Sequence, residues 1–183
     1  MISFQPLLAS TAQVQECVRH LRNQEAVRRY MYTEHEISAQ EHQAWLTSLA
    51  DNPRQSVFVV MVDGMARGVV SLSAIDRLHQ SADWAFYLDT ELQGKGLGSQ
   101  VECWLLDHAF GEVGLAKLNC EVLASNPAVV RLHQKFGFTL EGVRRQNVLK
   151  DGQRLDVVLL GITAEEWQAR RPEIIERLAR LKG

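Results

Sequence analysis

This chain of 183 residues has few cysteines and prolines, and neither sign of charge is in large excess. The three cysteines, Cys17, Cys103 and Cys120, are odd in number and widely spaced, and no CxxC pair is present. This pattern argues against a disulfide framework and a structural zinc site, and we expect three reduced, buried thiols. The net charge of −2 gives no general attraction to nucleic acid or to an anionic membrane.

Long apolar runs are absent as well. No segment approaches the ~18 apolar residues that a membrane-spanning helix needs, and the first residues lack the basic and apolar regions of a signal peptide. We therefore expect a cytoplasmic protein. Four of the six histidines form no spaced set of metal ligands: His20, His35, His79 and His108. We therefore predict no metal site and interpret these four as structural or solvated.

Length and composition are those of one globular domain spanning residues 1–183. Thr11 is a candidate helix cap, because Val14, Cys17, Val18 and Leu21 follow at helical spacing. Ser38 and Glu41 predict a capping box for a second helix, whose face is formed by His42, Trp45, Leu46 and Leu49. The segment 21–33 between these helices is less regular.

The remaining pattern alternates strands and helices, which predicts an α/β (α+β) domain with a mixed sheet. Turn signals at Asp63-Gly64 and Asp151-Gly152 each join two strands. The expected strands cover 2–8, 56–62, 67–75, 82–88, 117–123, 139–149 and 155–162. Further helices are expected over about 99–110, from Asn126 to Gly137, and over about 164–181, the last of these amphipathic.

The clearest chemical signal is a glycine-rich turn between a strand and a helix. Gly94, Gly96 and Gly98 let the backbone come close to a ligand, and Lys95 adds a cation. The first N–H groups of the following helix have no partner within the helix, so they suit a phosphate or pyrophosphate. The spacing fits neither the phosphate-loop motif of NTPases nor the dinucleotide-binding fingerprint.

A second motif follows 33 residues after Gln93 and runs from Asn126 to Phe138. With Gln93-x-x-Gly96-x-Gly98 it resembles the acetyl-CoA-binding motifs of the GNAT superfamily of N-acetyltransferases. The resemblance implies a mostly antiparallel mixed sheet, flanked by helices, in which one parallel strand pair splays apart to admit the pantetheine of acetyl-CoA. A backbone N–H near Leu88 or Asp89 would polarise the acetyl carbonyl. The implied cofactor residues are Leu88, Asp89, Gln93, Gly94, Lys95, Gly96, Leu97, Gly98, Ser99 and Asn126.

Two residues are candidates for proton transfer. His133 stands where the superfamily often has a tyrosine that protonates the leaving thiolate, and an imidazole could do the same work. The alternative is a surface histidine that only packs. Glu121 alternates out of phase with its apolar neighbours, so it could accept the proton of the amine or simply face solvent; Asp83 and Glu141 are weaker candidates.

For the acceptor, the N-terminal half resembles the family of N-acetyltransferases of pseudaminic acid biosynthesis. The matching residues are Leu21-Arg-Asn23, Tyr30-Met-Tyr-Thr33, Ile37-Ser38, Glu41-His42 and Trp45-Leu46. That family acetylates the 4-amino group of UDP-4-amino-4,6-dideoxy-N-acetyl-β-L-altrosamine. The resemblance places Arg22 and His42 with the nucleotide phosphates, and the following four residues around the sugar: Met31, Tyr32, Trp45 and Trp84.

Three alternatives stay open at this stage. The aromatic residues could be ordinary core. The segment Gly137–Arg145 also resembles enzymes that acetylate the N-termini of ribosomal proteins. A non-catalytic acyl-CoA-binding sensor would use the same fold. The sequence leaves a monomer and a homodimer equally open.

Overall fold

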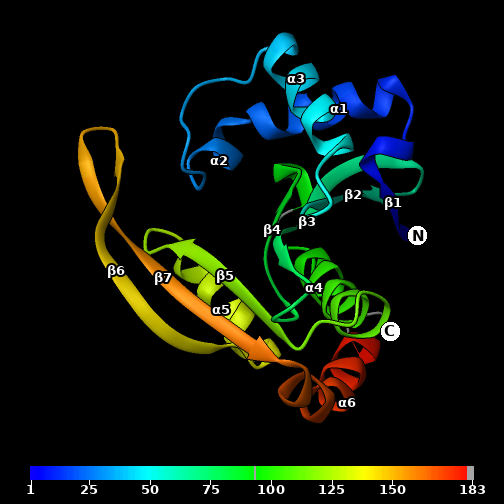
Figure 1. Cartoon of the computed structure of the whole chain (residues 1–183), viewed down its shortest axis with the longest axis vertical. Coiled ribbons are helices and arrows are strands. Elements are labelled where there is room, and N and C mark those ends of the chain that lie inside the picture. The colour runs from blue at the N-terminus through cyan, green and yellow to red at the C-terminus, as the bar shows by residue number, and fades with distance from the viewer. Residues whose placement is uncertain (93, 181–183) are drawn as a thin grey trace. The chain divides into compact units, whose positions relative to one another are not determined.

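The structure is a computed structural model that describes residues 1–92 and 94–180. The helices are α1 (Ala12–Asn23), α2 (Glu25–Arg28), α3 (Ala39–Ala50), α4 (Leu97–Asp107), α5 (Pro127–Phe136) and α6 (Ala164–Arg180). The strands are β1 (Ile2–Pro6), β2 (Ser56–Val62), β3 (Met65–Asp76), β4 (Ser81–Leu88), β5 (Lys117–Leu123), β6 (Thr139–Lys150) and β7 (Gln153–Thr163) (Figure 1). Gln93 and Leu181, two residues named in the predictions, lie outside the described residues.

The strands form one seven-stranded sheet in the order β1-β2-β3-β4-β5-β7-β6. The strand pairs β1/β2, β2/β3, β5/β7 and β6/β7 are antiparallel. β4 and β5 run parallel, and their paired residues end at Asp83↔Asn119. The predicted mixed, mostly antiparallel sheet is confirmed. The described chain divides into two compact parts, residues 1–75 with 84–92 and residues 76–83 with 94–180, and the prediction of a single domain stays a prediction.

The first part contains β1–β3, the end of β4 and helices α1–α3. Its core comes from the predicted faces of α1 and α3, where Val18, Leu21, Leu46 and Leu49 are buried together with strand residues. Both predicted caps are confirmed. Thr11 accepts a hydrogen bond from the Val14 N–H, and the Ser38 capping box is complete.

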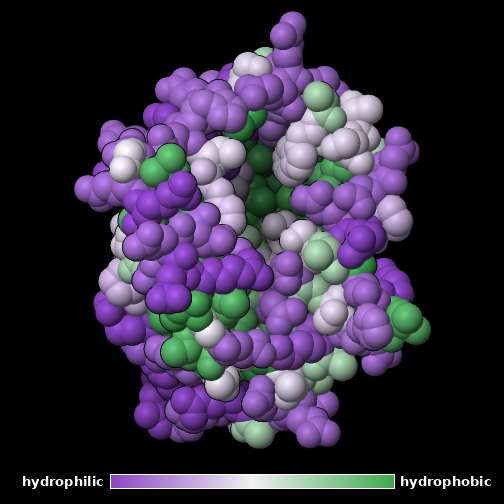
Figure 2. Space-filling model, turned by 60° about the vertical axis from the view of Figure 1, so that its left-hand side comes forward, coloured by the Kyte–Doolittle hydropathy of each residue, from purple (hydrophilic) through white to green (hydrophobic). Residues whose placement is uncertain are grey.

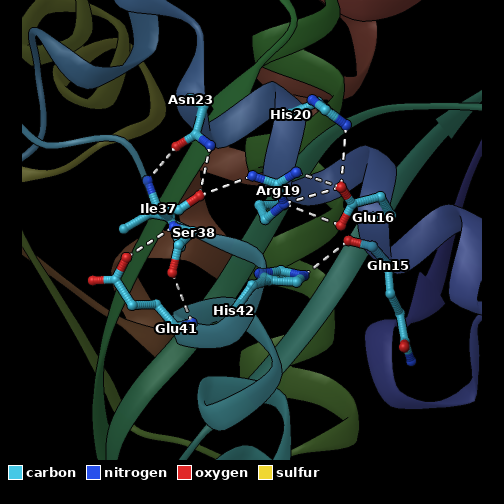
Figure 3. Close-up of polar contacts among 9 residues, drawn as sticks. All are labelled: Gln15, Glu16, Arg19, His20, Asn23, Ile37, Ser38, Glu41 and His42. Atoms are coloured by element: carbon cyan, nitrogen blue, oxygen red, sulfur yellow. Dashed lines mark hydrogen bonds and ion pairs between the residues drawn. The ribbon is translucent and has the colours of Figure 1, made fainter.

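Polar contacts tie α1 to the segment that precedes α3 (Figure 3). The Asn23 side chain accepts a hydrogen bond from the Ile37 N–H at 2.7 Å and donates one to the Ile37 carbonyl at 2.9 Å. Arg19 donates to the same carbonyl at 3.0 Å and pairs with Glu16. These bonds satisfy backbone groups of a segment that has no regular structure of its own. They therefore fix the C-terminal end of α1, where Arg22 lies.

The second part contains the start of β4, β5–β7 and helices α4–α6. β6 and β7 form a long hairpin whose turn is Asp151-Gly152, and both turn residues have positive φ (48° and 73°), as a tight hairpin turn requires (Figure 1). α4 begins two residues earlier than predicted and ends in a π-helical turn, His108–Glu112. α6 contacts α4, α5 and β7, and Trp167 of α6 donates a hydrogen bond to Asp107 at 2.9 Å.

The surface drawn in Figure 2 is mainly hydrophilic, and its hydrophobic residues fall in separate patches. Among the described residues, no helix combines the length and the apolar character that crossing a membrane requires.

Candidate functional site

The glycine-rich turn before α4 has the geometry expected of an anion-binding loop. Gly94 and Gly96 have φ of 78° and 74°, values that other residues rarely adopt, and, chain neighbours aside, no described atom lies within 4 Å of a Cβ built on either one. Gly96 is the N-cap of α4, and no side chain caps the helix. The first N–H groups of α4 therefore have no side-chain cap among the described residues and carry partial positive charge, next to the exposed Lys95.

Further cationic side chains lie close to this helix start. Ser99 lines a small cavity together with Lys135 of α5 and Arg177 of α6. On α5, Asn126 and Pro127 take the predicted N-cap and first helical positions. The Asn126 side chain makes no capping hydrogen bond, so capping does not prevent it from contacting the pantetheine. That contact stays a prediction.

The two predicted backbone donors differ in availability. The Asp89 N–H already donates to the Arg67 carbonyl at 2.7 Å, so it is not available to an acetyl carbonyl. This bond argues against Asp89 as the donor and favours Leu88, whose contact with the acetyl carbonyl stays a prediction. The Asp89 carboxylate accepts hydrogen bonds from Arg67 at 2.7 Å and Gln24 at 3.2 Å. Burial of this carboxyl opposes ionisation, but these bonds outweigh burial and hold its pKa below the usual value.

Glu121 lies in a row of polar residues on one face of the sheet. It is paired with Arg144 of β6, while Cys120 and Val122 on either side of it are buried, as the alternation predicts. Asp83 of β4 bonds to Asn119, and Lys117 links Asn119 at 2.7 Å to Glu141 at 2.6 Å. Burial, followed by the nearby charge of Glu121, raises the pKa of Asp83. The structure thus brings together the three carboxylates that the sequence singled out.

His133 is buried, which contradicts the surface-histidine alternative. Its Nδ1 lies 2.9 Å from Glu102 Oε1, and Glu102 of α4 is itself fully buried. Burial raises the pKa of Glu102, whereas the pairing with His133 opposes that shift. Sequence reasoning missed Glu102. The signal was available, because Leu105, Leu106 and Ala109 stand three, four and seven residues later on the same helix face.

Arg22 is held in the first part of the chain at the end of α1. Its Nη2 donates to the Thr33 hydroxyl at 2.8 Å. Its Nη1 is buried and has no hydrogen-bond partner among the residues that the structure describes. Burial lowers the pKa of this guanidinium, and the nearby charge of Arg28 adds to the effect, while the Tyr87 hydroxyl opposes it. This Nη1 nitrogen therefore still has hydrogen bonds to donate.

The other residues expected near the acceptor have mainly packing contacts. His42 is buried, its Nε2 lies 2.9 Å from the Gln15 carbonyl (Figure 3), and burial lowers its pKa. A neutral ring that donates through Nε2 has no second N–H for a phosphate. Trp45 packs on the core and against His42, and Trp84 is buried beside Phe86. Tyr32 is exposed and Met31 half-buried. Their roles at the acceptor stay predictions.

The cysteines are free thiols, and burial raises the pKa of each one, to about 11 for Cys103. In Cys120 the charge of Glu102 adds to the effect of burial. A thiol with a raised pKa is a poor nucleophile at neutral pH. Within residues 1–92 and 94–180, no three His, Cys, Asp or Glu side chains gather as a metal-binding group.

The comparisons with known proteins agree with this geometry. Spermidine N(1)-acetyltransferase of Escherichia coli (strain K12) is 28% identical over 153 residues, which cover 83% of this chain and 82% of that protein. L-amino acid N-acetyltransferase of the same strain is 23% identical over 114 residues, covering 61% and 70%. The structure of spermidine N-acetyltransferase from Vibrio cholerae in complex with CoA and spermine has a TM-score of 0.84 at 23% identity, covering 91% and 98%.

The relatives are named for different acceptors, spermidine and L-amino acids, so the acceptor of this chain does not follow from them. The family model described as acetyltransferase (GNAT) domain matches residues 8–139, which include strands β2 to β5, the glycine-rich loop and α5. With the fold and the loop geometry described above, this match shows that the chain belongs to the GNAT family of N-acetyltransferases.

Proposed function

We propose that this acetyl-CoA-dependent N-acetyltransferase acts on a primary amine carried by a small anionic molecule. The acceptor that fits both the sequence resemblance and the charge is UDP-4-amino-4,6-dideoxy-N-acetyl-β-L-altrosamine, acetylated at its 4-amino group. One observation carries this choice: the buried Nη1 of Arg22 has no hydrogen-bond partner among the described residues. A diphosphate oxygen would supply one, with the added strength of a charged hydrogen bond.

The charges around Arg22 favour an anion over a polycation. The nearest cation that affects it is Arg28, and its two polar neighbours, Thr33 and Tyr87, are neutral. Arg22 itself forms no ion pair among the described residues, and its positive charge attracts a diphosphate and repels an ammonium group. The Met31 and Tyr32 side chains, half-buried and exposed respectively, are of the types that stack on a base or pack on a deoxy-sugar.

A polyamine is the second candidate acceptor, because relatives over most of the chain are named spermidine acetyltransferases. A polycation needs several available carboxylates. Along the segment that runs from α1 to α3, four glutamates have a basic partner, an arginine or a histidine, within the chain. These pairs are Glu16–Arg19, Glu25–Arg29, Glu36–Arg28 and Glu41–His35. Pairing within the protein reduces what these carboxylates offer to a polyamine. An acyl-CoA-binding sensor has no such observation in its favour.

The chemistry proposed is direct transfer within a ternary complex. The loop of Gly94 to Gly98, the start of α4 and Lys95 would hold the pyrophosphate of acetyl-CoA, and the acetyl group is what the cosubstrate supplies. In this scheme the carboxylates of Asp83 and Glu121 would receive the amine proton, and His133 would protonate the thiolate that leaves. A covalent intermediate on Cys120 is disfavoured, because burial raises the pKa of that thiol.

The first test offers three acceptors with acetyl-CoA: the UDP-4-amino sugar, spermidine, and peptides with ribosomal N-termini. Release of free CoA thiol and a mass gain of one acetyl group are followed together. We expect acetylation of the sugar nucleotide, with little transfer to the others. Transfer to spermidine alone would overturn the anionic acceptor and favour the polyamine candidate, and transfer to peptides alone would favour N-terminal acetylation.

The second test replaces the guanidinium. Arg22→Met should raise the KM for the sugar nucleotide by about tenfold to 100-fold, because a hydrogen bond to a charged group is worth roughly 1.5–3 kcal/mol. The matched control is Arg29→Met, since Arg29 is an exposed arginine nearby that pairs only weakly with Glu25. Acetyl-CoA affinity should stay unchanged in both variants. Equal KM values for Arg22→Met and Arg29→Met would remove Arg22 from the acceptor site.

A further inference from the structure

A carboxylate and an imidazole are buried together between α4 and α5. Glu102 is 0% exposed and His133 3% exposed, and Glu102 Oε1 lies 2.9 Å from His133 Nδ1. The second oxygen, Oε2, is buried without a hydrogen-bond partner among the described residues. Phe138 packs its ring at 5.4 Å from the imidazole.

Stability alone does not account for this pair. A buried carboxylate loses its hydration, and an oxygen left without a partner is destabilising by about 1–3 kcal/mol or more. Apolar side chains of similar volume usually replace buried ion pairs without loss of stability. α4 already presents such side chains around Glu102, namely Leu105 and Leu106. The carboxylate is therefore better explained by what it does to the imidazole.

Burial also decides how many protons the pair holds. With its full complement of protons the pair is neutral, whether the proton between them lies on Nδ1 or on Oε1. Loss of one proton leaves a net negative charge in an apolar site, which burial disfavours. Two further titratable groups interact with Glu102, Cys103 of α4 and Cys120 of β5, and burial raises the pKa of both thiols, which keeps them neutral.

We propose that Glu102 is a positioning residue for His133: it holds the proton on Nδ1 and keeps a second, transferable proton on Nε2 for the thiolate that leaves. This inference rests on the proposed acetyl transfer. Glu102 itself touches neither the cosubstrate nor the acceptor in this scheme, and it acts only through the imidazole.

The step balances as follows. The amine nitrogen attacks the thioester carbonyl carbon, and a carboxylate or water takes the proton that the amine loses. The C–S bond breaks, and its electron pair goes to sulfur. The His133 Nε2 proton then passes to sulfur to give the CoA thiol, which leaves the ring neutral with its remaining proton on Nδ1, hydrogen-bonded to the Glu102 carboxylate. Solvent restores the Nε2 proton after product release. The net reaction gives one amide and one thiol.

The test compares Glu102→Gln, which keeps an acceptor for Nδ1–H but removes the charge, with Glu112→Gln. The control fits closely, because Glu112 also lies 2.9 Å from a histidine Nδ1, that of His108, but at the surface. We expect kcat of Glu102→Gln to fall by about tenfold to 100-fold at pH 8, part of the 10²–10⁴-fold that a general acid contributes. The alkaline limb of its pH–rate profile should shift down by about one unit or more.

A purely structural role of Glu102 would leave the position of the alkaline limb unchanged. In the proposed role, Glu102→Gln should instead regain activity at lower pH. Unchanged kcat and an unchanged limb in a folded Glu102→Gln protein would overturn the proposal. So would a loss of activity that is the same at every pH. If the wild-type protein acetylates none of the three acceptors, the proposed function itself falls.

A measurement on the wild-type protein guards against misfolding of the variant. Nitrogen-15 NMR of labelled histidine, with the His133 signals assigned through His133→Asn, reports which ring nitrogen carries a proton. We expect a protonated Nδ1 throughout the range in which Nε2 titrates. An unprotonated Nδ1 at high pH would overturn the positioning role, whatever the acceptor is.

Discussion

Gly68 offers a sharp test of how β3 and β4 are packed. A Cβ at this position would lie 2.5 Å from the Tyr87 carbonyl oxygen, 2.6 Å from a Leu88 methyl group and 3.2 Å from the Leu88 Cα. Two of these three atoms belong to the backbone, so rotation of a side chain cannot remove the clash. Gly68→Ala should therefore push β3 away from β4 at Leu88, the candidate donor to the acetyl carbonyl.

Overpacking of this kind usually lowers the free energy of unfolding by about 1–3 kcal/mol. For a chain of this length, that corresponds to a fall in Tm of about 2–12 °C. The matched control is Gly142→Ala in β6, where the new Cβ would meet only a Leu159 methyl group at 3.8 Å. An alanine in a strand without such a clash should be neutral or slightly stabilising.

Urea unfolding followed by circular dichroism would measure the free energies of unfolding, and kcat would be measured on the same samples. Gly68→Ala should be less stable than Gly142→Ala, and its kcat should fall even at temperatures where it is fully folded. Equal unfolding midpoints for the two variants would refute the close approach of β3 to β4. A stable Gly68→Ala with normal kcat would also separate Leu88 from the chemistry.

Two further predictions follow from the titratable groups. The pKa of Asp89 is lower in the folded chain than its ordinary value of 3.8. Its ionised form therefore stabilises the fold above pH 3.8, and this stabilisation is lost as pH falls through the folded pKa. Acid unfolding of Asp89→Asn should show a weaker pH dependence below about pH 4 than that of the wild type. Cys120→Ala should keep most of the acetyl transfer, measured as product formation, because a buried thiol with a raised pKa takes no part in direct attack; loss of activity in a folded variant would support a covalent step.

Local signals predicted the elements that carry the site. The caps at Thr11 and Ser38 need only residues within one helical turn, and the Asp151-Gly152 turn needs only its own two residues. The glycine-rich loop is also a local pattern, because the positive φ of Gly96 is a property of one residue. The fold could be predicted from such signals, together with the resemblance of two motifs.

The contacts that decide chemistry could not be predicted, because their partners are far apart in the sequence. Glu102 and His133 are 31 residues apart, and the alternation of apolar residues indicates that a position is buried but not which partner it meets. The availability of the Asp89 N–H depended on the Arg67 carbonyl in another strand. The same holds for His42, whose predicted phosphate contact has to compete with its bond to the Gln15 carbonyl.

Relatives say more about how this chain binds acetyl-CoA than about how it binds its acceptor. The expected pyrophosphate contact uses backbone N–H groups at the start of α4, so it survives wide changes in side chains, and a solved structure at 23% identity shares the fold. The acceptor contact depends on side chains such as Arg22, and one substitution there alters charge without altering the fold. Relatives can therefore share the transfer reaction while acetylating spermidine in one case and an L-amino acid in another. For this reason Arg22→Met should separate the two halves of the site, changing the KM of the acceptor but not the affinity for acetyl-CoA.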